Sequence, residues 1–174
     1  MEKIATRESF GRALEELGME NKKVVVLDAD LYNSTKTEYF KEKYPDRFIN
    51  VGIAEADMIG TAAGLSTCGK IPYASTFAAF ATGRVYDQIR TSIAYPKLNV
   101  KICATHAGIT VGEDGATHQM LEDINLMRGL PNMVVMSTSD DIETKWAVKE
   151  IAKYNGPVYL RPVSYTHLTL PTIA

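Results

Sequence analysis

The sequence predicts an α/β fold, a three-layer sandwich in which a mostly parallel sheet of about six strands carries helices on both faces. Short apolar runs alternate along the chain with segments of helical periodicity. The runs are apolar on both faces, as is typical of buried parallel strands. Each parallel crossover needs an element that covers the sheet, so the alternation favours helices on both sides. The 174 residues suit one such domain.

The first half of the chain supplies three predicted strands and three predicted helices. Apolar residues at positions 10, 13, 14 and 17 indicate a first helix of about three turns, with Thr6 as N-cap and Gly18 as its end. The polar segment 31–37, LYNSTKT, is typical of a turn. We expect strands over residues 24–27, 48–51 and 71–75, and further helices over residues 54–68 and from 77 to about 96.

The second half continues the alternation. We expect strands over residues 99–104, 133–136 and 158–160, a short helix over 119–127 and an amphipathic helix over 142–154. No repeat, heptad or low-complexity segment competes with this interpretation. The sequence has neither a GxGxxG nor a GxxxxGK[ST] motif, so the two commonest nucleotide-binding interpretations of such a sheet lack their motif.

Composition and charge narrow the class of protein. A net charge of −2 and an apolar fraction of 45% give no indication of binding to nucleic acid or a membrane. With neither an apolar leader nor a run of about 18 apolar residues, we expect a cytoplasmic protein. Cys68 and Cys103 stand singly in apolar surroundings, so we expect buried free thiols rather than a disulfide or a zinc site.

The most informative stretch is a glycine-rich loop, residues 105–122, which follows the predicted strand 99–104 directly and reads THAGITVGEDGATHQMLE. It holds His106 and His118, with the acid Asp114 between them. Its glycines permit a tight path with positive φ angles: Gly108, Gly112 and Gly115. Ligands of open α/β sheets bind outside the carboxyl ends of the strands, which makes the loop a candidate site. A plain connection whose histidines only cap and face solvent is the alternative.

Three segments carry a family resemblance: GIAEADM at residues 52–58, STFAAF at 75–80 and THAGITVGEDGATHQ at 105–119. Together with DADLYNS at 28–34 they resemble the pyrimidine-binding domain of transketolase, a thiamine-diphosphate enzyme of pentose phosphate metabolism. The resemblance runs in the family's order over residues 4–161. The related 1-deoxy-D-xylulose-5-phosphate synthases also have GIAE and a glycine-rich loop with a histidine, but TVGEDGATHQ is nearer to transketolase.

The resemblance implies a thiamine-diphosphate-binding fold that forms half of an active site. In that family this domain holds the aminopyrimidine end of thiamine diphosphate, while a separate domain holds the diphosphate and its magnesium or calcium ion. We therefore expect an N-terminal transketolase subunit as partner, in a homodimer or a heterotetramer. An apolar face near residues 55–68 and the loop around Phe77 should meet it.

The domain is expected to span residues 1–162. Transketolase C-terminal subunits normally continue into a third α/β domain at this point. Residues 163–174, VSYTHLTLPTIA, have no helical period and resemble nothing in the family. We interpret them as a non-native or read-through tail and leave them out of the fold prediction.

The residues expected at the cofactor are Glu55, Phe77, Phe80 and Asp30. Taken alone, Glu55 would complement a helix dipole and the two phenylalanines would belong to the core. The resemblance implies instead that Glu55 is the glutamate that hydrogen-bonds the pyrimidine ring nitrogen and activates the cofactor, its charged form disfavoured by burial. It implies that Phe77 and Phe80 line the pyrimidine pocket, and that Asp30 lies near the cofactor.

The resemblance also implies a substrate site. His106 is expected near the ketose hydroxyls and the reacting carbons, as a catalytic residue beside Glu55, and Asp114 at a substrate hydroxyl. The sugar phosphate is expected to bind charge-assisted donors: His118, Ser34, Arg7 and Arg161. The implied reaction transfers a two-carbon ketol unit from a ketose phosphate to an aldose phosphate, with the cofactor as electron sink.

Three alternatives remain open. A deoxyxylulose-phosphate synthase would use the same cofactor on pyruvate. A non-catalytic subunit would only complete the pocket of another chain. A metal-dependent hydrolase built on His106, Asp114 and His118 is disfavoured, because the 11 residues between the histidines match no recognised zinc spacing, and we assign no metal ligand in this chain.

Overall fold

The fold is built on a parallel sheet whose strands the sequence predicts. The computed structural model describes residues 4–109, 111 and 113–162, and within them six strands pair, all parallel, in the order β2-β1-β3-β4-β6-β5. The strands are β1 (Val24–Asp28), β2 (Phe48–Asn50), β3 (Ile71–Phe77), β4 (Lys101–Thr105), β5 (Val134–Thr138) and β6 (Val158–Pro162). Each boundary falls within two residues of its predicted position.

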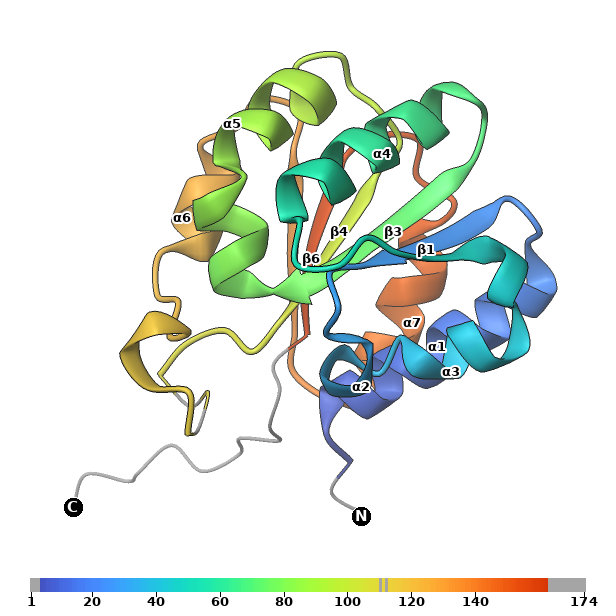
Figure 1. Ribbon diagram of the computed structural model, residues 1–174, viewed down its shortest axis with the longest axis horizontal. Coiled ribbons are helices and arrows are strands. Elements are labelled where there is room, and N and C mark those ends of the chain that lie inside the picture. The colour runs from blue at the N-terminus through green and yellow to red at the C-terminus, as the bar shows by residue number, and fades with distance from the viewer. Residues whose placement is uncertain (1–3, 110, 112, 163–174) are drawn as a thin grey trace.

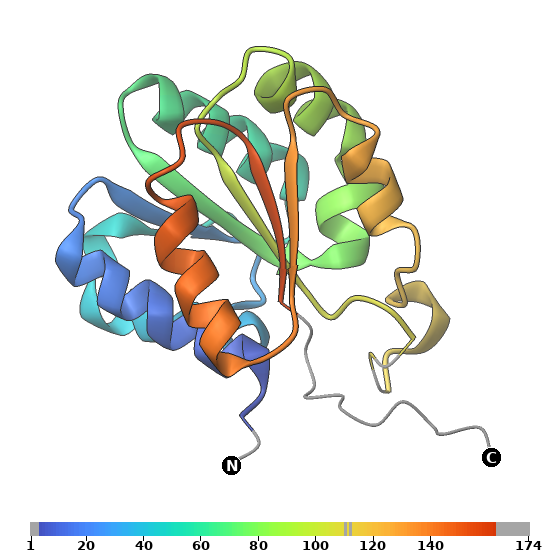
Figure 2. The same ribbon diagram turned by 180° about the vertical axis from the view of Figure 1, so that it is seen from behind.

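Helices cover both faces of this sheet, which confirms the predicted three-layer fold (Figure 1). One face carries α1 (Thr6–Glu20), α3 (Glu38–Lys43) and α7 (Asp141–Ile151). Figure 2 shows α1 and α7 side by side on that face. The other face carries α4 (Glu55–Thr67), α5 (Tyr86–Ile89) and α6 (Asp123–Arg128).

Two apolar clusters fill the space between the sheet and its helices, one on each face. In β1, Val24 and Val26 pack with α1, whereas Leu27 packs with α4. In β3, Tyr73 likewise belongs to the cluster on the α1 side and Ala74 to the cluster on the α4 side. Successive side chains of a strand point to opposite faces, so a central strand must be apolar throughout. That requirement is what made the strands predictable.

The single long helix expected over residues 77–96 is wrong. Phe77 is the last residue of β3, and the segment after it consists of the π-helices η2 (Ala79–Arg84) and η3 (Arg90–Ala94) around α5. The expected buried stripe is present: Ala81, Val85, Ile89 and Ile93. Its four-residue spacing drifts by about 40° per repeat on an α-helix. Wider π turns keep such a stripe directed at the sheet.

Other helix boundaries also differ from the prediction. The N-cap of α1 is Ala5 rather than Thr6, and the helix continues past Gly18 to Glu20. The segment expected as a turn contains one helical turn, α2 (Tyr32–Thr35), and the helix expected from residue 119 begins at Asp123. In both places tertiary contacts override the local propensity on which the prediction rests.

The cysteine prediction is half correct. Both thiols are free, but only Cys103 is buried, whereas Cys68 is exposed just after the end of α4. In the part of the chain that the structure describes, no helix is both long and apolar enough to span a membrane. The predictions for residues 163–174 and for Gly112 lie outside the described residues.

Gly18 serves the packing of α1 rather than its termination. A Cβ atom at this position would lie 2.5 Å from a ring carbon of Tyr44 and 2.6 Å from a ring carbon of Phe40. The missing side chain therefore lets α3 and the residue after it approach α1 closely enough to bury Phe40 completely.

We expect Gly18→Ala to lower the free energy of unfolding by about 1–3 kcal/mol, the usual cost of overpacking, although alanine is the better helix former. Gly64→Ala is the matched control, because Gly64 lies in α4 with nothing within 4 Å of its would-be Cβ. That change should be neutral or add up to about 1 kcal/mol. Urea unfolding of the three chains measures both effects, and equal midpoints for the two variants would contradict this account of Gly18.

Candidate functional site

The candidate site lies at the edge of the sheet where the parallel strands end. β1 ends at Asp28, β3 at Phe77 and β4 at Thr105. The strand order reverses between β1 and β3, because the chain passes outward from β1 to β2 and then returns to the other side of β1. Ligands of open α/β sheets bind at such a switch point. In Figure 1 the loops after these strands lie on the same side of the sheet as the start of α1.

Two phenylalanines and two histidines form one aromatic cluster at this edge. The rings of Phe77 and Phe80 are stacked, with 6.1 Å between centroids. His106 stacks on Phe77 at 4.0 Å, and His118 meets Phe80 edge-on at 5.1 Å. The four side chains come from β3, η2 and the glycine-rich loop, so the structure brings together residues that the sequence could only place in separate motifs.

Glu55 joins this cluster through an arginine that the sequence analysis missed. It is the first residue of α4 and only 3% exposed, and Nη1 of Arg84 donates to its Oε1 at 2.8 Å and its Oε2 at 2.9 Å. The guanidinium carbon of Arg84 also lies 4.2 Å from the centroid of the Phe80 ring. One signal was available, because Arg84 follows Phe80 by four residues, a spacing that brings side chains together on one helical face. Burial alone disfavours a charged carboxylate, but this cation offsets that cost.

The imidazole of His106 is buried and tied down at both nitrogens. Arg7 donates from Nη1 to Nε2 at 3.2 Å. Since arginine can only donate, Nε2 accepts and the ring proton sits on Nδ1, which faces Oγ1 of Thr105 at 2.8 Å. Burial lowers the pKa of His106 to about 4, assisted by the positive charge of Arg7 and opposed by Asp114. The ring is therefore neutral at neutral pH. The backbone of His106 adopts a φ of 55°, in the left-handed region.

Positive charge flanks the histidine loop from two elements. Arg7 reaches it from α1, and Nη2 of Arg161 in β6 lies 3.8 Å from the place that a Cβ on Gly108 would take. Asp123 positions Arg161, with 2.8 Å between its Oδ2 and Nε of the arginine. The hydroxyl of Tyr159 donates to the same oxygen at 2.7 Å. Two guanidinium groups at one loop suit an anionic ligand.

The remaining predicted residues lie around this centre. Asp30 is exposed after β1 and exchanges hydrogen bonds with Asn50, at 2.9 and 3.1 Å. Ser34 is half-buried in α2, and Asp114 is exposed before the 3-10 turn η4 (Gly115–Thr117). The predicted positive φ angles are confirmed at two loop glycines: Gly108 (81°) and Gly115 (68°).

Asp28, which the sequence analysis did not single out, holds the loop after β1 in place. Its side chain is fully buried and accepts hydrogen bonds from three residues of that loop: Leu31 through its backbone N–H, and Thr35 and Thr37 through their hydroxyls. Burial raises the pKa of Asp28 to about 6, although these hydrogen bonds act in the opposite direction. The acid is a structural support for the segment that carries Asp30 and Ser34.

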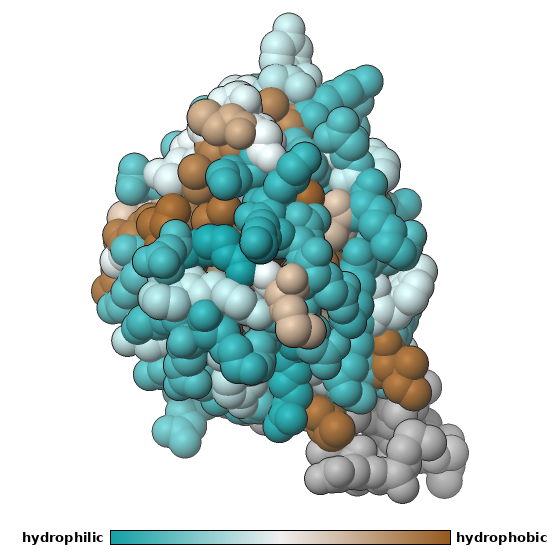
Figure 3. Space-filling view, turned by 90° about the vertical axis from the view of Figure 1, so that its right-hand side faces the viewer, coloured by the Kyte–Doolittle hydropathy of each residue, from teal (hydrophilic) through white to brown (hydrophobic). Residues whose placement is uncertain are grey.

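The surface expected to meet a partner is partly exposed: α4 carries exposed small residues beside Asp57, and Ala79 and Phe80, which follow the buried Phe77 at the start of η2, are half-exposed. Three small residues one turn apart on α4 are exposed: Ala56, Gly60 and Gly64. Ile53, just before the helix, is 80% exposed, whereas Phe77 is 5% exposed and lies beneath His106. Figure 3 shows one side of the molecule, mostly hydrophilic, on which hydrophobic residues gather along one margin. Phe77 is covered by the chain itself because it ends a central strand.

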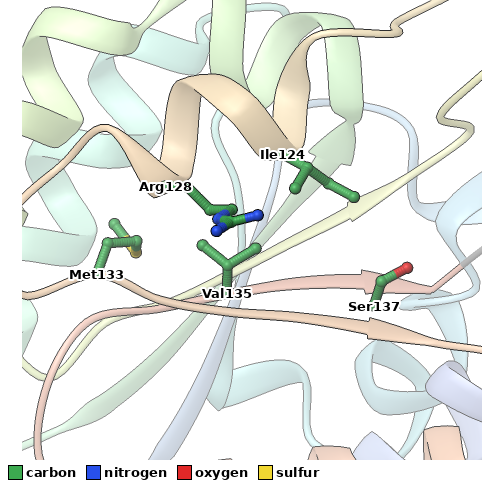
Figure 4. A pocket seen from close by; sticks show the side chains of 5 residues that line it. All are labelled: Ile124, Arg128, Met133, Val135 and Ser137. Atoms are coloured by element: carbon green, nitrogen blue, oxygen red, sulfur yellow. The ribbon is translucent and has the colours of Figure 1, made fainter.

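A hollow between α6 and β5 lies apart from this site. Figure 4 shows its lining, in which Arg128 extends from α6 over the side chain of Val135, with Ile124, Met133 and Ser137 around them. None of the predicted site residues takes part. Among the described residues, no three His, Cys, Asp or Glu side chains gather in a group that could hold a metal ion, so the hydrolase alternative gains no support.

Comparison with known proteins finds one family across the whole domain. The family model described as "Transketolase, pyrimidine binding domain" matches residues 2–162. A protein of Methanocaldococcus jannaschii that is named as a transketolase C-terminal section is 58% identical over 155 residues, which cover 89% of this chain and 49% of that protein. A 6-deoxy-6-sulfo-D-fructose transketolase subunit from Clostridium sp. is 42% identical, over 89% of this chain and 48% of the relative.

A solved structure agrees with these sequence matches. The protein described as "Split gene transketolase, inactive beta4 tetramer" is 56% identical and superimposes with a TM-score of 0.84, over 96% of this chain and 53% of the other. The chain thus spans about half the length of each of these three relatives.

The neutral state of His106 can be tested by NMR titration of its imidazole. We expect the ring to stay neutral down to about pH 4. Arg7→Met should raise the pKa of His106 because a neighbouring positive charge is removed, and Asp114→Asn should lower it further because an opposing negative charge is removed. A wild-type pKa near 6.5, or no response to Arg7→Met, would contradict the arrangement.

The same group should affect stability. The pKa of His106 falls from 6.5 to about 4 on folding, so between these values the unfolded chain binds the proton more readily than the folded chain. Its contribution to the free energy of unfolding should therefore rise with pH from about 4 to 6.5, by up to about 3 kcal/mol. His106→Gln should remove that rise from the pH dependence of urea unfolding.

Proposed function

The chain belongs to the transketolase family, as its pyrimidine-binding domain, and from this premise we propose that it is one half of a two-polypeptide transketolase. The complete enzyme would transfer a two-carbon ketol unit from a ketose phosphate to an aldose phosphate. One observation carries the proposal. Contacts run without a break along one edge of the sheet, from the buried carboxylate of Glu55 through Arg84 and the aromatic cluster to His106 and Arg7.

At the Glu55 end of this line of contacts, the described residues fit an aminopyrimidine ring. Glu55 presents a buried carboxylate that can share a proton with a ring nitrogen, and Phe80 presents an aromatic face beside it. The ring of Phe77 stacks with the ring of Phe80. When bound, thiamine diphosphate supplies the electron sink for breaking the bond next to a ketone. We assign Asp30 to the neighbourhood of the cofactor, and the diphosphate with its magnesium or calcium ion to the partner subunit.

We assign the other end to the sugar phosphate. Arg7 and Arg161 supply fixed positive charge, and Ser34 supplies a hydroxyl from α2. We place His106 at the ketose hydroxyls, where its neutral ring can donate or accept a hydrogen bond. We assign His118, whose ring meets Phe80 edge-on at 5.1 Å, to the group that binds the sugar phosphate. Asp114 would meet a hydroxyl between these ends.

The names of the relatives support a separate partner. The relative from Methanocaldococcus jannaschii is named as a C-terminal section, and the solved relative is described as a split-gene transketolase that is inactive as a β4 tetramer. We propose that an N-terminal subunit completes the site here, in a homodimer or a heterotetramer. The exposed small residues of α4, together with Ile53, are the proposed contact surface, since exposed apolar residues near a site mark interfaces.

A sulfonated ketose is a second candidate substrate. The Clostridium relative is named for 6-deoxy-6-sulfo-D-fructose, and two arginines can bind a sulfonate as well as a phosphate. Deoxyxylulose-phosphate synthesis from pyruvate is less favoured, because the three relatives described above are named transketolases. Ketol-transfer assays with phosphorylated and sulfonated ketoses decide between the substrates.

The test uses this chain reconstituted with the N-terminal subunit. We expect ketol transfer only from the mixture, and we expect Glu55→Gln to lower kcat by about 10²–10⁴-fold, the range for a positioned acid–base group. Asp57→Asn is the matched control, because Asp57 is a second acid in the first turn of α4 but is exposed. If Glu55 merely complements the helix dipole, the two variants should behave alike, and the proposed role would be wrong.

A further inference from the structure

Arg84 contacts both side chains that the proposed function assigns to the pyrimidine ring, Glu55 and Phe80. Its Nη1 lies 2.8 and 2.9 Å from the two oxygens of Glu55, and its guanidinium carbon lies 4.2 Å from the centroid of Phe80. Among the described residues no other side chain or backbone group donates a hydrogen bond to this carboxylate. An unpaired buried carboxylate is strongly unfavourable, so Arg84 is what makes a buried Glu55 tolerable in the absence of a ligand.

We propose that the Arg84 guanidinium is an internal stand-in for the aminopyrimidine ring, held in its place until the cofactor displaces it. The inference rests on the proposed function and adds a residue to it. A guanidinium and an aminopyrimidine protonated at its ring nitrogen share the relevant chemistry: both are planar, both donate an N–H group to a carboxylate, and both stack on an aromatic face. One pair of receptors, Glu55 and Phe80, can therefore hold either of them but not both.

The exposure of the pair shows how displacement can occur. The side chain of Glu55 is 3% exposed, whereas that of Arg84 is 49% exposed. The carboxylate therefore stays fixed at the start of α4, and the guanidinium can move into water without unpacking the core. Water can solvate the half-exposed guanidinium once it leaves Glu55, so the arginine is a displaceable competitor rather than a permanent block.

This arrangement makes Arg84 a positioning and gating residue. It keeps the Glu55 side chain oriented and paired, and it lowers the apparent affinity for the pyrimidine because it must leave first. Pyrimidine that is held by this chain alone has to compete with Arg84 for Glu55 and Phe80. Cofactor that is already anchored to the partner subunit by its diphosphate reaches these two side chains at a high effective concentration, and it can therefore displace Arg84.

The test measures binding of 4-amino-5-hydroxymethyl-2-methylpyrimidine, which has the aminopyrimidine but no diphosphate, to this chain by isothermal titration. We expect Arg84→Ala to bind it about 3- to 30-fold more tightly than the wild type, the combined effect of losing an exposed ion pair and a cation–π contact. Arg84→Gln, which keeps one amide donor for Glu55, should lie between them. Arg90→Ala is the control, because Arg90 is an exposed arginine in η3 whose ion pair with Asp87 is long, at 4.0 Å.

A second measurement follows Arg84 directly by ¹⁵N NMR of its guanidinium in the wild type. Its Nη signals should show hindered rotation in the free chain, and faster rotation once the pyrimidine is added. Glu55→Gln should give the faster rotation without any ligand. This readout remains available if Arg84→Ala fails to fold.

Three results would each overturn the inference: binding by Arg84→Ala that is equal to or weaker than that of the wild type, no binding by any variant, or a guanidinium that stays on Glu55 with the pyrimidine bound. None of these results bears on ketol transfer by the reconstituted enzyme, which tests the proposed function separately. Loss of ketol transfer in the reconstituted wild type would overturn the proposed function even if the Arg84 contact were present.

Discussion

The site depends on one constraint, a carboxylate buried at the start of a helix. Glu55 is almost completely covered, and a charge in that position requires a cation or strong hydrogen-bond donors within reach. In this chain the requirement is met by Arg84, whose own position depends on η2 and on the ring of Phe80. The wide turns of η2 are thus part of the site, since π segments inside helices often occur at functional positions.

The parallel sheet explains why the other residues meet. Its strands end at a common edge, and the reversal of strand order beside β1 leaves room for a ligand there. β3 ends in Phe77 and β4 is followed at once by His106, whose unusual backbone conformation turns its ring onto Phe77. Charge then comes from more distant parts of the chain, with Arg7 from α1 and Arg161 from β6.

The sequence predicted the strands well because central strands must be apolar on both faces, a pattern that β-branched runs make plain. It also named the residues of the aromatic cluster, because their motifs resemble those of one family. It could not predict Arg84 as the partner of Glu55, since the two lie 29 positions apart and the chain between them folds through a strand and a π-helix. It misjudged Gly18, because a glycine that ends a helix and one that admits a neighbouring ring look the same in sequence.

The central claim is that Glu55 activates a bound thiamine rather than stabilising a helix. The most direct measurement is proton exchange at the thiazolium carbon of thiamine diphosphate, followed by NMR in the complex of this chain with its N-terminal subunit and without any sugar. The account predicts rapid exchange in the wild type and exchange slower by about 10²-fold or more in Glu55→Gln, because a neutral amide cannot share a proton with the pyrimidine nitrogen. Exchange at the wild-type rate in that variant would contradict it.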